Sequence, residues 1–274
     1  MIKAIFYDLG LVNRGWRKVT TCFRAEISCD TSKIIGRALY KNGVYELATS
    51  ELVWKLLKQK PDALFVDIGA NIGYYTLLAS NALGGNGQII SFEPVPYLYE
   101  KLVGNINGGN INNYQYAVSS KDGVALLSIP QYADSNDGIA TLEICEKSLE
   151  SYEVKTITLD NFIDREIFIL KMDIEGHEYS ALSGAVKLLS HRKIKHIVFE
   201  DHNIKDSGIS ELLQSFGYTI FSIGWDFYGP LIKPLSEPKS SLVVEAPNYI
   251  ATISMDEVLK VSSKGWSILQ RDKF

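Results

Sequence analysis

Short apolar runs alternate with amphipathic segments over most of the chain. The run 63–67 predicts a buried strand, and the apolar residues Tyr75, Leu78 and Leu83 that follow it recur at helical spacing. The same pattern predicts further strands at 88–93, 114–118, 167–173, 194–200 and 218–223, and helices at 49–59, 96–106, 179–189 and 211–216. Strands that alternate with helices in this way predict an α/β fold with a doubly wound, mostly parallel sheet and helices on both faces.

The two ends of the chain and one internal stretch depart from this alternation. Residues 1–40 show no clean period, and 5–10 is interpreted as an N-terminal strand or cap. Between 119 and 159, the segments 124–129 and 153–159 alternate like the strands of a hairpin. Prolines interrupt 224–248, which is predicted to be mostly loop, and 249–253 is expected to pair antiparallel with 218–223. We predict a single domain over 1–274, with an N-terminal extension and helix (1–60), a core (61–223), and a loop with C-terminal elements that can cap a substrate (224–274).

Composition and charge narrow the class of protein. With 46% hydrophobic and 22% charged residues among 274, the chain can bury a sizeable core, and its net charge of −4 argues against nucleic-acid binding. The cysteines Cys22, Cys29 and Cys145 show no C-x-x-C spacing, so neither a disulfide framework nor a zinc site is indicated. No apolar run approaches the roughly 20 residues of a membrane span, and the N-terminal apolar run is too short for a signal peptide. We therefore expect a soluble, cytoplasmic protein.

The stretch 64–79, L-F-V-D-I-G-A-N-I-G-Y-Y-T-L-L-A, combines a strand, a tight turn and the start of a helix. Gly69 and Gly73 remove the Cβ atoms that would keep a ligand away from the N–H groups of the turn. A dinucleotide fingerprint needs G-x-G-x-x-G and an NTPase phosphate loop needs G-K-S/T, and the stretch contains neither. The form D-x-G-x-(G/N)-x-G is typical of S-adenosylmethionine (SAM) methyltransferases, and Asp67 suits a ligand with an ammonium and a sulfonium. An ordinary glycine turn after a buried strand is the alternative.

Carboxylates end four of the predicted strands, namely Asp67, Glu93, Asp173 and Glu200. In an open α/β sheet the ligand lies beyond the carboxyl ends of the strands. Glu93, twenty residues after Gly73, can accept hydrogen bonds from both ribose hydroxyls of an adenosine, although a solvated strand end is the alternative. Val118 and Ser119 are placed to lie along an adenine ring.

The segment 171–178, K-M-D-I-E-G-H-E, crowds charged side chains and a histidine directly after a buried strand. Strand alternation places Lys171 and Asp173 on one face, with Asp173 at the rim. Crowded carboxylates at a low-dielectric rim shift one another's pKa values, which suits proton abstraction or metal binding. We favour function for Asp173 and Glu175, leave His177 open between function and packing, and expect Glu178 to complement the positive N-terminus of the following helix.

With these motifs, the sequence resembles the FkbM-type family of SAM-dependent methyltransferases. The matching segments are G-V-Y-E (43–46), V-D-I-G-A-N-I-G-Y-Y-T (66–76), S-F-E-P (91–94), A-V-S-S-K-D-G (117–123), T-I-T-L-D (156–160), L-K-M-D-I-E-G-H-E (170–178) and I-V-F-E (197–200). The resemblance implies a seven-stranded, Rossmann-like methyltransferase sheet and methyl transfer, usually to a hydroxyl of a carbohydrate or natural product. The cofactor-binding set that follows is Glu46, Asp67, Gly69, Ala70, Asn71, Gly73, Glu93, Pro94, Val118, Ser119 and Asp173. Asp173 and Glu175 are expected beside the reacting methyl group.

The predicted function is SAM-dependent O-methyl transfer to a hydroxyl of a carbohydrate or related hydroxylated metabolite. Such a reaction aligns two reactants and needs the acceptor proton removed by a base or a metal. Asp173 or His177 is the expected base, with Glu175 and Glu200 positioning the acceptor. A variant in which Asp173, Glu175 and Glu200 hold Mg²⁺ ranks below this metal-free route.

Two other functions remain as alternatives: a non-catalytic SAM-fold binding or assembly protein, and a small-molecule N-methyltransferase. The glycine turn and the acidic cluster are both intact, which argues against the first. A neutral amine needs no strong base, so the second leaves the acidic cluster unexplained. We expect a small-molecule or glycan acceptor, without nucleic acid or a membrane span, while the identity of the acceptor and the oligomeric state stay open.

Overall fold

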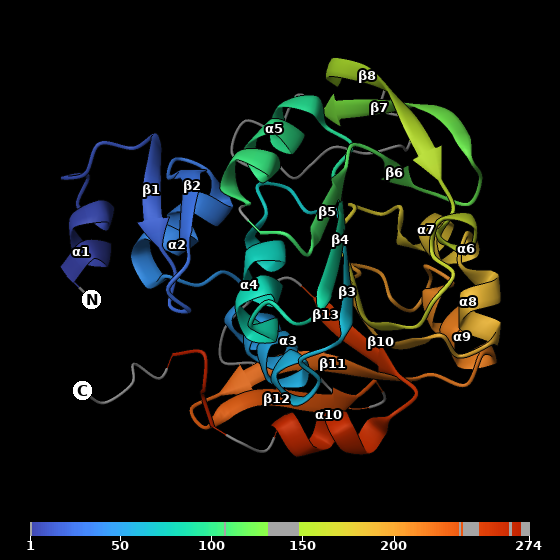
Figure 1. Cartoon of the computed structure of the whole chain (residues 1–274). Helices are drawn as coiled ribbons and strands as arrows, with labels where there is room; N and C mark the ends of the chain where they lie inside the picture. Colours follow the sequence, from blue (N-terminus) through green and yellow to red (C-terminus); the bar gives the residue numbers. More distant parts are fainter. Residues whose placement is uncertain are drawn as a thin grey trace.

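The computed structural model describes residues 2–106, 108–130, 148–235, 237, 247–262 and 265–269, so Cys145 lies outside the described part. Within it, eight strands form the central sheet (Figure 1). In sheet order they are β12 (Gly229–Pro234), β11 (Thr219–Asp226), β13 (Asn248–Thr252), β10 (Ile194–Glu200), β9 (Ile167–Met172), β3 (Leu64–Ile68), β4 (Gln88–Phe92) and β5 (Ile111–Tyr114). Only β12 and β13 run against the other strands. The predicted doubly wound, mostly parallel α/β fold is confirmed.

The strands of this sheet are apolar on both faces because helices cover both. In β3, Leu64, Val66 and Ile68 pack into one hydrophobic cluster and Phe65 into the other. The cluster around Phe65 is completed by α3 (Leu47–Gln59), α4 (Tyr74–Leu83), α5 (Pro96–Asn105) and α10 (Met255–Ser262). The opposite cluster is completed by α6 (Leu159–Phe162), α7 (Glu178–Ser183), α8 (Val186–Ser190) and α9 (Ile209–Ser215). Continuous apolar strands are expected for a sheet buried in this way.

Two predicted core elements are each divided in the structure. The strand expected at 114–118 is split between β5 and β6 (Ala117–Val118), because β6 leaves the central sheet and pairs with β8 (Ser148–Ile157). A third strand, β7 (Gly123–Pro130), pairs antiparallel with β8, which confirms the predicted hairpin. The helix expected at 179–189 is divided into α7 and α8 around Gly184, where a Cβ would lie 2.1 Å from the carbonyl oxygen of Ser119.

The C-terminal part contains one more strand than the sequence predicts. Strand β13 pairs antiparallel with β11, as expected, but it also pairs with β10 and so lies between the two. The prediction that 224–248 is mostly loop was wrong for β12, which follows a turn closed by Asp226. The Asp226 carboxylate accepts hydrogen bonds from the N–H groups of Tyr228 and Gly229. Strand β12 forms the sheet edge, where the missing N–H of a proline is tolerated.

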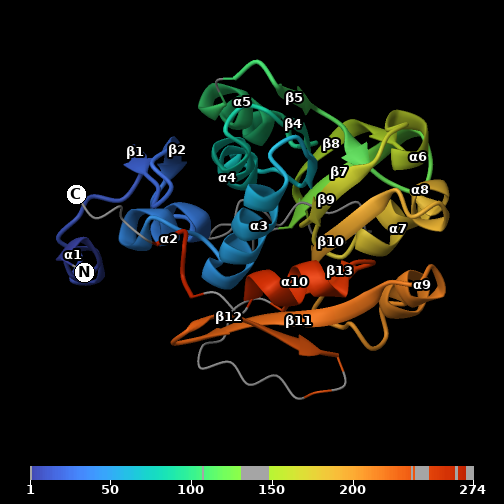
Figure 2. The same cartoon turned by 60° about the horizontal axis from the view of Figure 1, so that its bottom comes forward.

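The N-terminal residues form a helix, α1 (Ile2–Asp8), so the expected strand or cap at 5–10 was wrong. Tyr7 accounts for the helix, since its hydroxyl donates to the carbonyl of Thr31 (2.6 Å) and its ring packs against Tyr40. A hairpin of β1 (Trp16–Thr20) and β2 (Glu26–Asp30) and the helix α2 (Ile34–Asn42) follow. In both views these elements lie to one side of the main sheet (Figures 1 and 2). Apolar residues of the hairpin nevertheless join the cluster formed by α3, α4 and α5.

In the described part of the chain, every helix is too short or too polar to cross a lipid bilayer.

Candidate functional site

The turn between β3 and α4 presses against the loop that follows β9. Gly69, Asn71 and Gly73 all have positive φ angles (77°, 51° and 93°). A Cβ on Gly69 would lie 2.0 Å from the carbonyl oxygen of Asp173, and one on Gly73 would lie 2.9 Å from the Leu102 side chain. Both positions favour glycine because their positive φ angles strain any larger residue, and at Gly69 a Cβ would also clash with the backbone. The turn is held at the loop that carries Asp173.

Glu93 and Asp67 are buried carboxylates on the two sides of this turn. The carboxylate of Glu93 accepts hydrogen bonds from the N–H groups of Asn71 (2.8 Å) and Val95 (2.9 Å). Asp67 accepts one from the Thr76 hydroxyl at 2.7 Å. Burial raises the pKa of Glu93 to about 7 and that of Asp67 to about 6, despite these hydrogen bonds. Both carboxylates shape the turn, whichever ligand it binds.

An apolar pocket opens beside the turn, at the carboxyl ends of β3 and β4. It is lined by Ile68, Gly69, Phe92, Pro94, Tyr116, Ala117, Val118, Leu127, Ile174 and His177. Gly69, Pro94 and Val118 belong to the set predicted from sequence. Ser119 lies next to the pocket, where its hydroxyl is 3.0 Å from Nε2 of His177. The mostly apolar lining suits an aromatic ring system.

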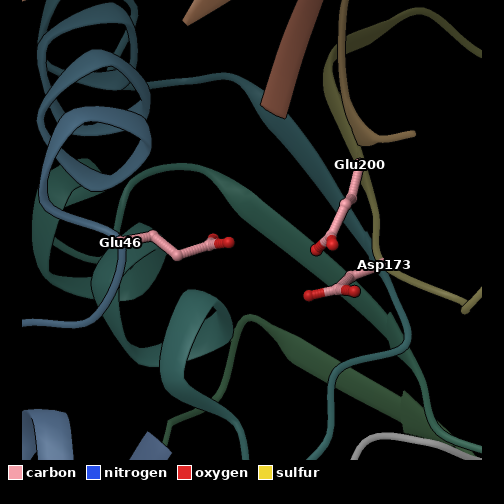
Figure 3. Close-up of side chains that lie close together, drawn as sticks. All are labelled: Glu46, Asp173 and Glu200. Carbon is pink, nitrogen blue, oxygen red and sulfur yellow. The ribbon is translucent and has the colours of Figure 1, made fainter. Parts of the chain in front are cut away.

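Three carboxylates converge on the other side of the turn (Figure 3). Glu46 reaches in from the start of α3, while Asp173 and Glu200 follow β9 and end β10. Among the described residues, these are the acidic groups that approach closely enough to share an ion, with oxygens all within 4.8 Å of one another. We call Glu46, Asp173 and Glu200 the carboxylate group.

Glu46 is held in the carboxylate group by two segments distant in sequence. Its backbone adopts a left-handed conformation (φ 43°) immediately before α3. The Tyr75 hydroxyl of α4 donates to one carboxylate oxygen (2.6 Å), and the side-chain amide of Asn248 in β13 donates to the other (2.8 Å). Glu46 is predicted from the sequence, whereas Tyr75 and Asn248 are not, because no local pattern links them to Glu46 across 29 and 202 positions.

The electrostatics of the carboxylate group favour proton uptake near neutral pH. Burial, and then the negative charge of Asp173, raise the pKa of Glu200 to about 7. The same two causes raise the pKa of Glu175 to about 7. Burial also raises the pKa of Glu46 above its usual value. Such carboxylates can hold a proton or stabilise a cation in the pH range where most enzymes work.

The predicted trio of Asp173, Glu175 and Glu200 is only partly brought together. Glu46 takes the third place in the carboxylate group, whereas Glu175 lies on the adjoining loop with a left-handed backbone (φ 50°). His177 faces Ser119 and the apolar pocket. Glu178 stands in the first turn of α7, as predicted, and accepts hydrogen bonds at 3.0 Å from the N–H groups of Ile174 and Gly176 in the preceding loop.

The spacing of the carboxylate group would suit an oxygen-binding cation such as Mg²⁺. However, the ammonium of Lys171 already lies 3.5 Å from Asp173 and supplies a positive charge there. A cation of the chain itself therefore already lies beside the carboxylate group, and we assign no metal.

Comparison with known proteins relates most of the central sheet to methyltransferases. The methyltransferase FkbM domain matches residues 67–220. The hexuronic acid methyltransferase AglP of Haloferax volcanii is 25% identical over 166 residues, which are 58% of this chain and 64% of that protein. The chain thus spans less than two thirds of the length of this relative.

Solved structures with a similar fold include other methyltransferases. Methyltransferase FkbM from Methylobacillus flagellatus KT is 16% identical, with a TM-score of 0.47 over 70% of this chain and 44% of that chain. Magnesium protoporphyrin IX methyltransferase (ChlM) from Synechocystis PCC 6803, solved with bound SAM, is 9% identical, with a TM-score of 0.40 over 75% of this chain and 77% of that chain. Because the family match covers more than half of the chain and takes in both the glycine turn and Asp173, the chain belongs to the FkbM methyltransferase family.

Proposed function

We propose that this protein is a SAM-dependent O-methyltransferase whose acceptor is a hydroxyl of a carbohydrate or a related hydroxylated metabolite. The observation that carries the proposal is the carboxylate group at the edge of the sheet, directly beside a glycine turn. Hydroxyl methylation requires a bound cationic methyl donor and a proton-accepting group, and this arrangement offers a place for the first and carboxylates for the second.

The residues around the turn fit the parts of SAM. The apolar pocket with Pro94 and Val118 suits the adenine ring, with Ala70 and Ser119 at its border. Glu93 has lone pairs left to accept the ribose hydroxyls after its two backbone hydrogen bonds. The carboxylate group suits the ammonium and the sulfonium. When bound, SAM supplies the methyl group that the acceptor oxygen receives.

The chain's own part in the reaction is to orient the acceptor and to take its proton. In the proposed reaction the acceptor oxygen would form its bond to the methyl carbon while the bond from that carbon to the sulfonium sulfur breaks and the neutral thioether leaves. The acceptor proton would pass to the carboxylate of Asp173. Asp173 is the preferred base because it is partly exposed and is held beside the turn by its backbone N–H, which donates to the carbonyl of Ile68 (3.0 Å). Glu200 and Glu175 would hold the acceptor. The contacts of His177 with Ser119 favour a place for it at the adenine pocket.

The likeness to a hexuronic acid methyltransferase supports a sugar-like acceptor. A non-catalytic SAM-fold protein would not need carboxylates with a raised pKa around a partly open site. An N-methyltransferase acting on a neutral amine would not need a base there.

The test is a transfer assay with methyl-labelled SAM and a panel of uronic acids, neutral sugars, glycolipid headgroups, hydroxylated metabolites and amines. We expect label in a hydroxylated acceptor and equal rates with and without EDTA. Transfer confined to amines would contradict the proposal, and loss of activity in EDTA that Mg²⁺ restores would reinstate the metal route.

Donor binding is expected to strengthen as the pH rises through about 7. The raised pKa values of Glu93, Glu175 and Glu200 mean that these groups are protonated at lower pH and add negative charge around the cationic donor only above it. In the ligand-free protein the same groups stabilise the fold below their ordinary pKa of about 4.5, and that contribution is lost as the pH rises through about 7. The increase in Tm caused by SAM should therefore be larger at pH 8 than at pH 6. An equal increase at both values would argue against cation binding by these carboxylates.

A further inference from the structure

Lys171 is a fully buried lysine in the middle of the candidate site. It lies in β9 opposite Asp67 of β3. Its ammonium is 3.5 Å from Oδ2 of Asp173 and 3.3 Å from the carbonyl oxygen of Met172. It also lies 5.0 Å from the ring centroid of Tyr75, whose hydroxyl holds Glu46. Lys171 therefore contacts one member of the carboxylate group, Asp173, and lies over Tyr75, which supports a second member, Glu46.

A buried ammonium is unfavourable unless negative charge surrounds it. The groups that face Lys171 come from every neighbouring element: Asp67 in β3, Tyr75 in α4, Glu46 before α3, Asp173 after β9 and Glu200 at the end of β10. Burial by itself would lower the pKa of Lys171, but the surrounding carboxylates raise it above its usual value. The lysine thus stays charged and is unsuited to act as a base.

Lys171 in turn affects the pKa values of the carboxylates around it. The positive charge of Lys171 lowers the pKa of Glu46 and Glu200, against the effect of their burial. It acts in the same direction on Asp67 and Glu175. One cation is thus shared by several carboxylates, which leaves a surplus of negative charge.

We propose that Lys171 is a positioning residue of the donor site: its buried ammonium favours the ionised form of the carboxylate group and keeps the group in place, so that the group holds a net negative charge for a cationic donor. This inference rests on the proposed function. It assigns Lys171 no contact with the substrate, and its effect passes through Glu46, Asp173 and Glu200.

A second buried lysine provides a matched control. Lys55 is 8% exposed and lies 3.2 Å from Oε1 of Glu51, its neighbour in α3. Its ammonium donates to the carbonyls of Val261 and Gly265 and so ties the C-terminal segment to α3. Like Lys171, Lys55 is buried and forms an ion pair. Glu51, Val261 and Gly265, which its ammonium contacts, lie outside the carboxylate group.

The experiment is isothermal titration of SAM into the full-length wild type and the variants K171M, K171R and K55M across a range of pH. Removing a cation next to a carboxylate raises the pKa of that carboxylate by about 1–3 units. In K171M the pH midpoint of SAM affinity should therefore move up by about 1 unit or more, and K171R should restore most of the shift. K55M should lower the Tm and leave the midpoint unchanged. A folded K171M with the wild-type midpoint would overturn the inference.

A second variant keeps the inference testable if K171M folds poorly. If Lys171 serves to compensate charge, the double variant K171M/D173N should have a higher Tm than K171M, because it buries one carboxylate fewer without its cation. A double variant no more stable than K171M would show that Lys171 acts by packing alone. Wild-type protein that binds no SAM would overturn the proposed function together with this inference, whereas normal binding with an unshifted K171M overturns this inference only.

Discussion

Replacement of Asp173 by asparagine is expected to lower kcat by about 100- to 10,000-fold at saturating SAM. The amide keeps the shape of the side chain but cannot accept the proton of the acceptor hydroxyl, and general-base catalysis is worth about that factor. SAM affinity should weaken far less, by about tenfold, since one charge-assisted contact is worth about 1.5 kcal/mol. The measurement is steady-state kinetics on the acceptor found in the transfer assay, alongside titration of SAM.

The matched control for this variant is Asp201→Asn. Asp201 is the next carboxylate after Glu200 and is buried, but its oxygens accept hydrogen bonds from the N–H of Asn203 (2.7 Å) and the hydroxyl of Ser207 (2.6 Å). Its loss should cost about 1–2 kcal/mol of stability and change kcat by only about twofold. A folded Asp173→Asn protein with wild-type kcat would remove Asp173 as the base, even if SAM still binds.

Replacement of Gly69 by alanine should disrupt the donor site at its most crowded point. A Cβ there would lie 2.0 Å from the carbonyl oxygen of Asp173, and the φ of +77° is unfavourable for any side chain. We expect a loss of about 3 kcal/mol or more in the free energy of unfolding, from strain and clash together. Any protein that still folds should bind SAM at least about tenfold more weakly, because the turn has to move away from the loop after β9.

Gly104→Ala is the control for this substitution. Gly104 lies in α5 with open space around its Cβ position, so alanine should raise stability by about 0.5–1 kcal/mol and leave SAM binding unchanged. Chemical denaturation and SAM titration of both variants test the contrast. Equal stability of the two variants would show that the turn adapts freely and does not form a rigid cradle.

The sequence predicts the central strands well because the apolar residues that make them strands are neighbours in the chain. In 64–68, 88–92, 167–172 and 194–200 a mainly apolar run is sufficient to predict a buried strand. Elements with a tertiary cause are predicted poorly. Helix α1 depends on the contact of Tyr7 with Thr31, and the break between α7 and α8 depends on the backbone of Ser119 against Gly184.

In the candidate site, too, the locally encoded residues are predicted from the sequence and those held by tertiary contacts are not. Asp67, Glu93, Asp173 and Glu200 stand at strand ends, and the topology of a parallel sheet brings such ends to one edge. The support of the carboxylate group comes from side chains whose neighbours are distant in sequence. Asn248 meets Glu46 only because β13 inserts between β10 and β11. The sequence shows Lys171 only as a charged residue inside an apolar strand. The carboxylates that surround it, and so its proposed role, are evident only in the structure.

The most direct test of the proposed O-methyl transfer is nuclear magnetic resonance of the product formed from SAM with a ¹³C-labelled methyl group. The ¹³C chemical shift of the transferred methyl distinguishes a methyl ether from an N-methyl group. We expect a methyl ether on one hydroxyl of a sugar-like acceptor, formed by the wild type and nearly absent with Asp173→Asn. A labelled methyl on nitrogen or carbon, or an ether formed equally well by Asp173→Asn, would contradict it.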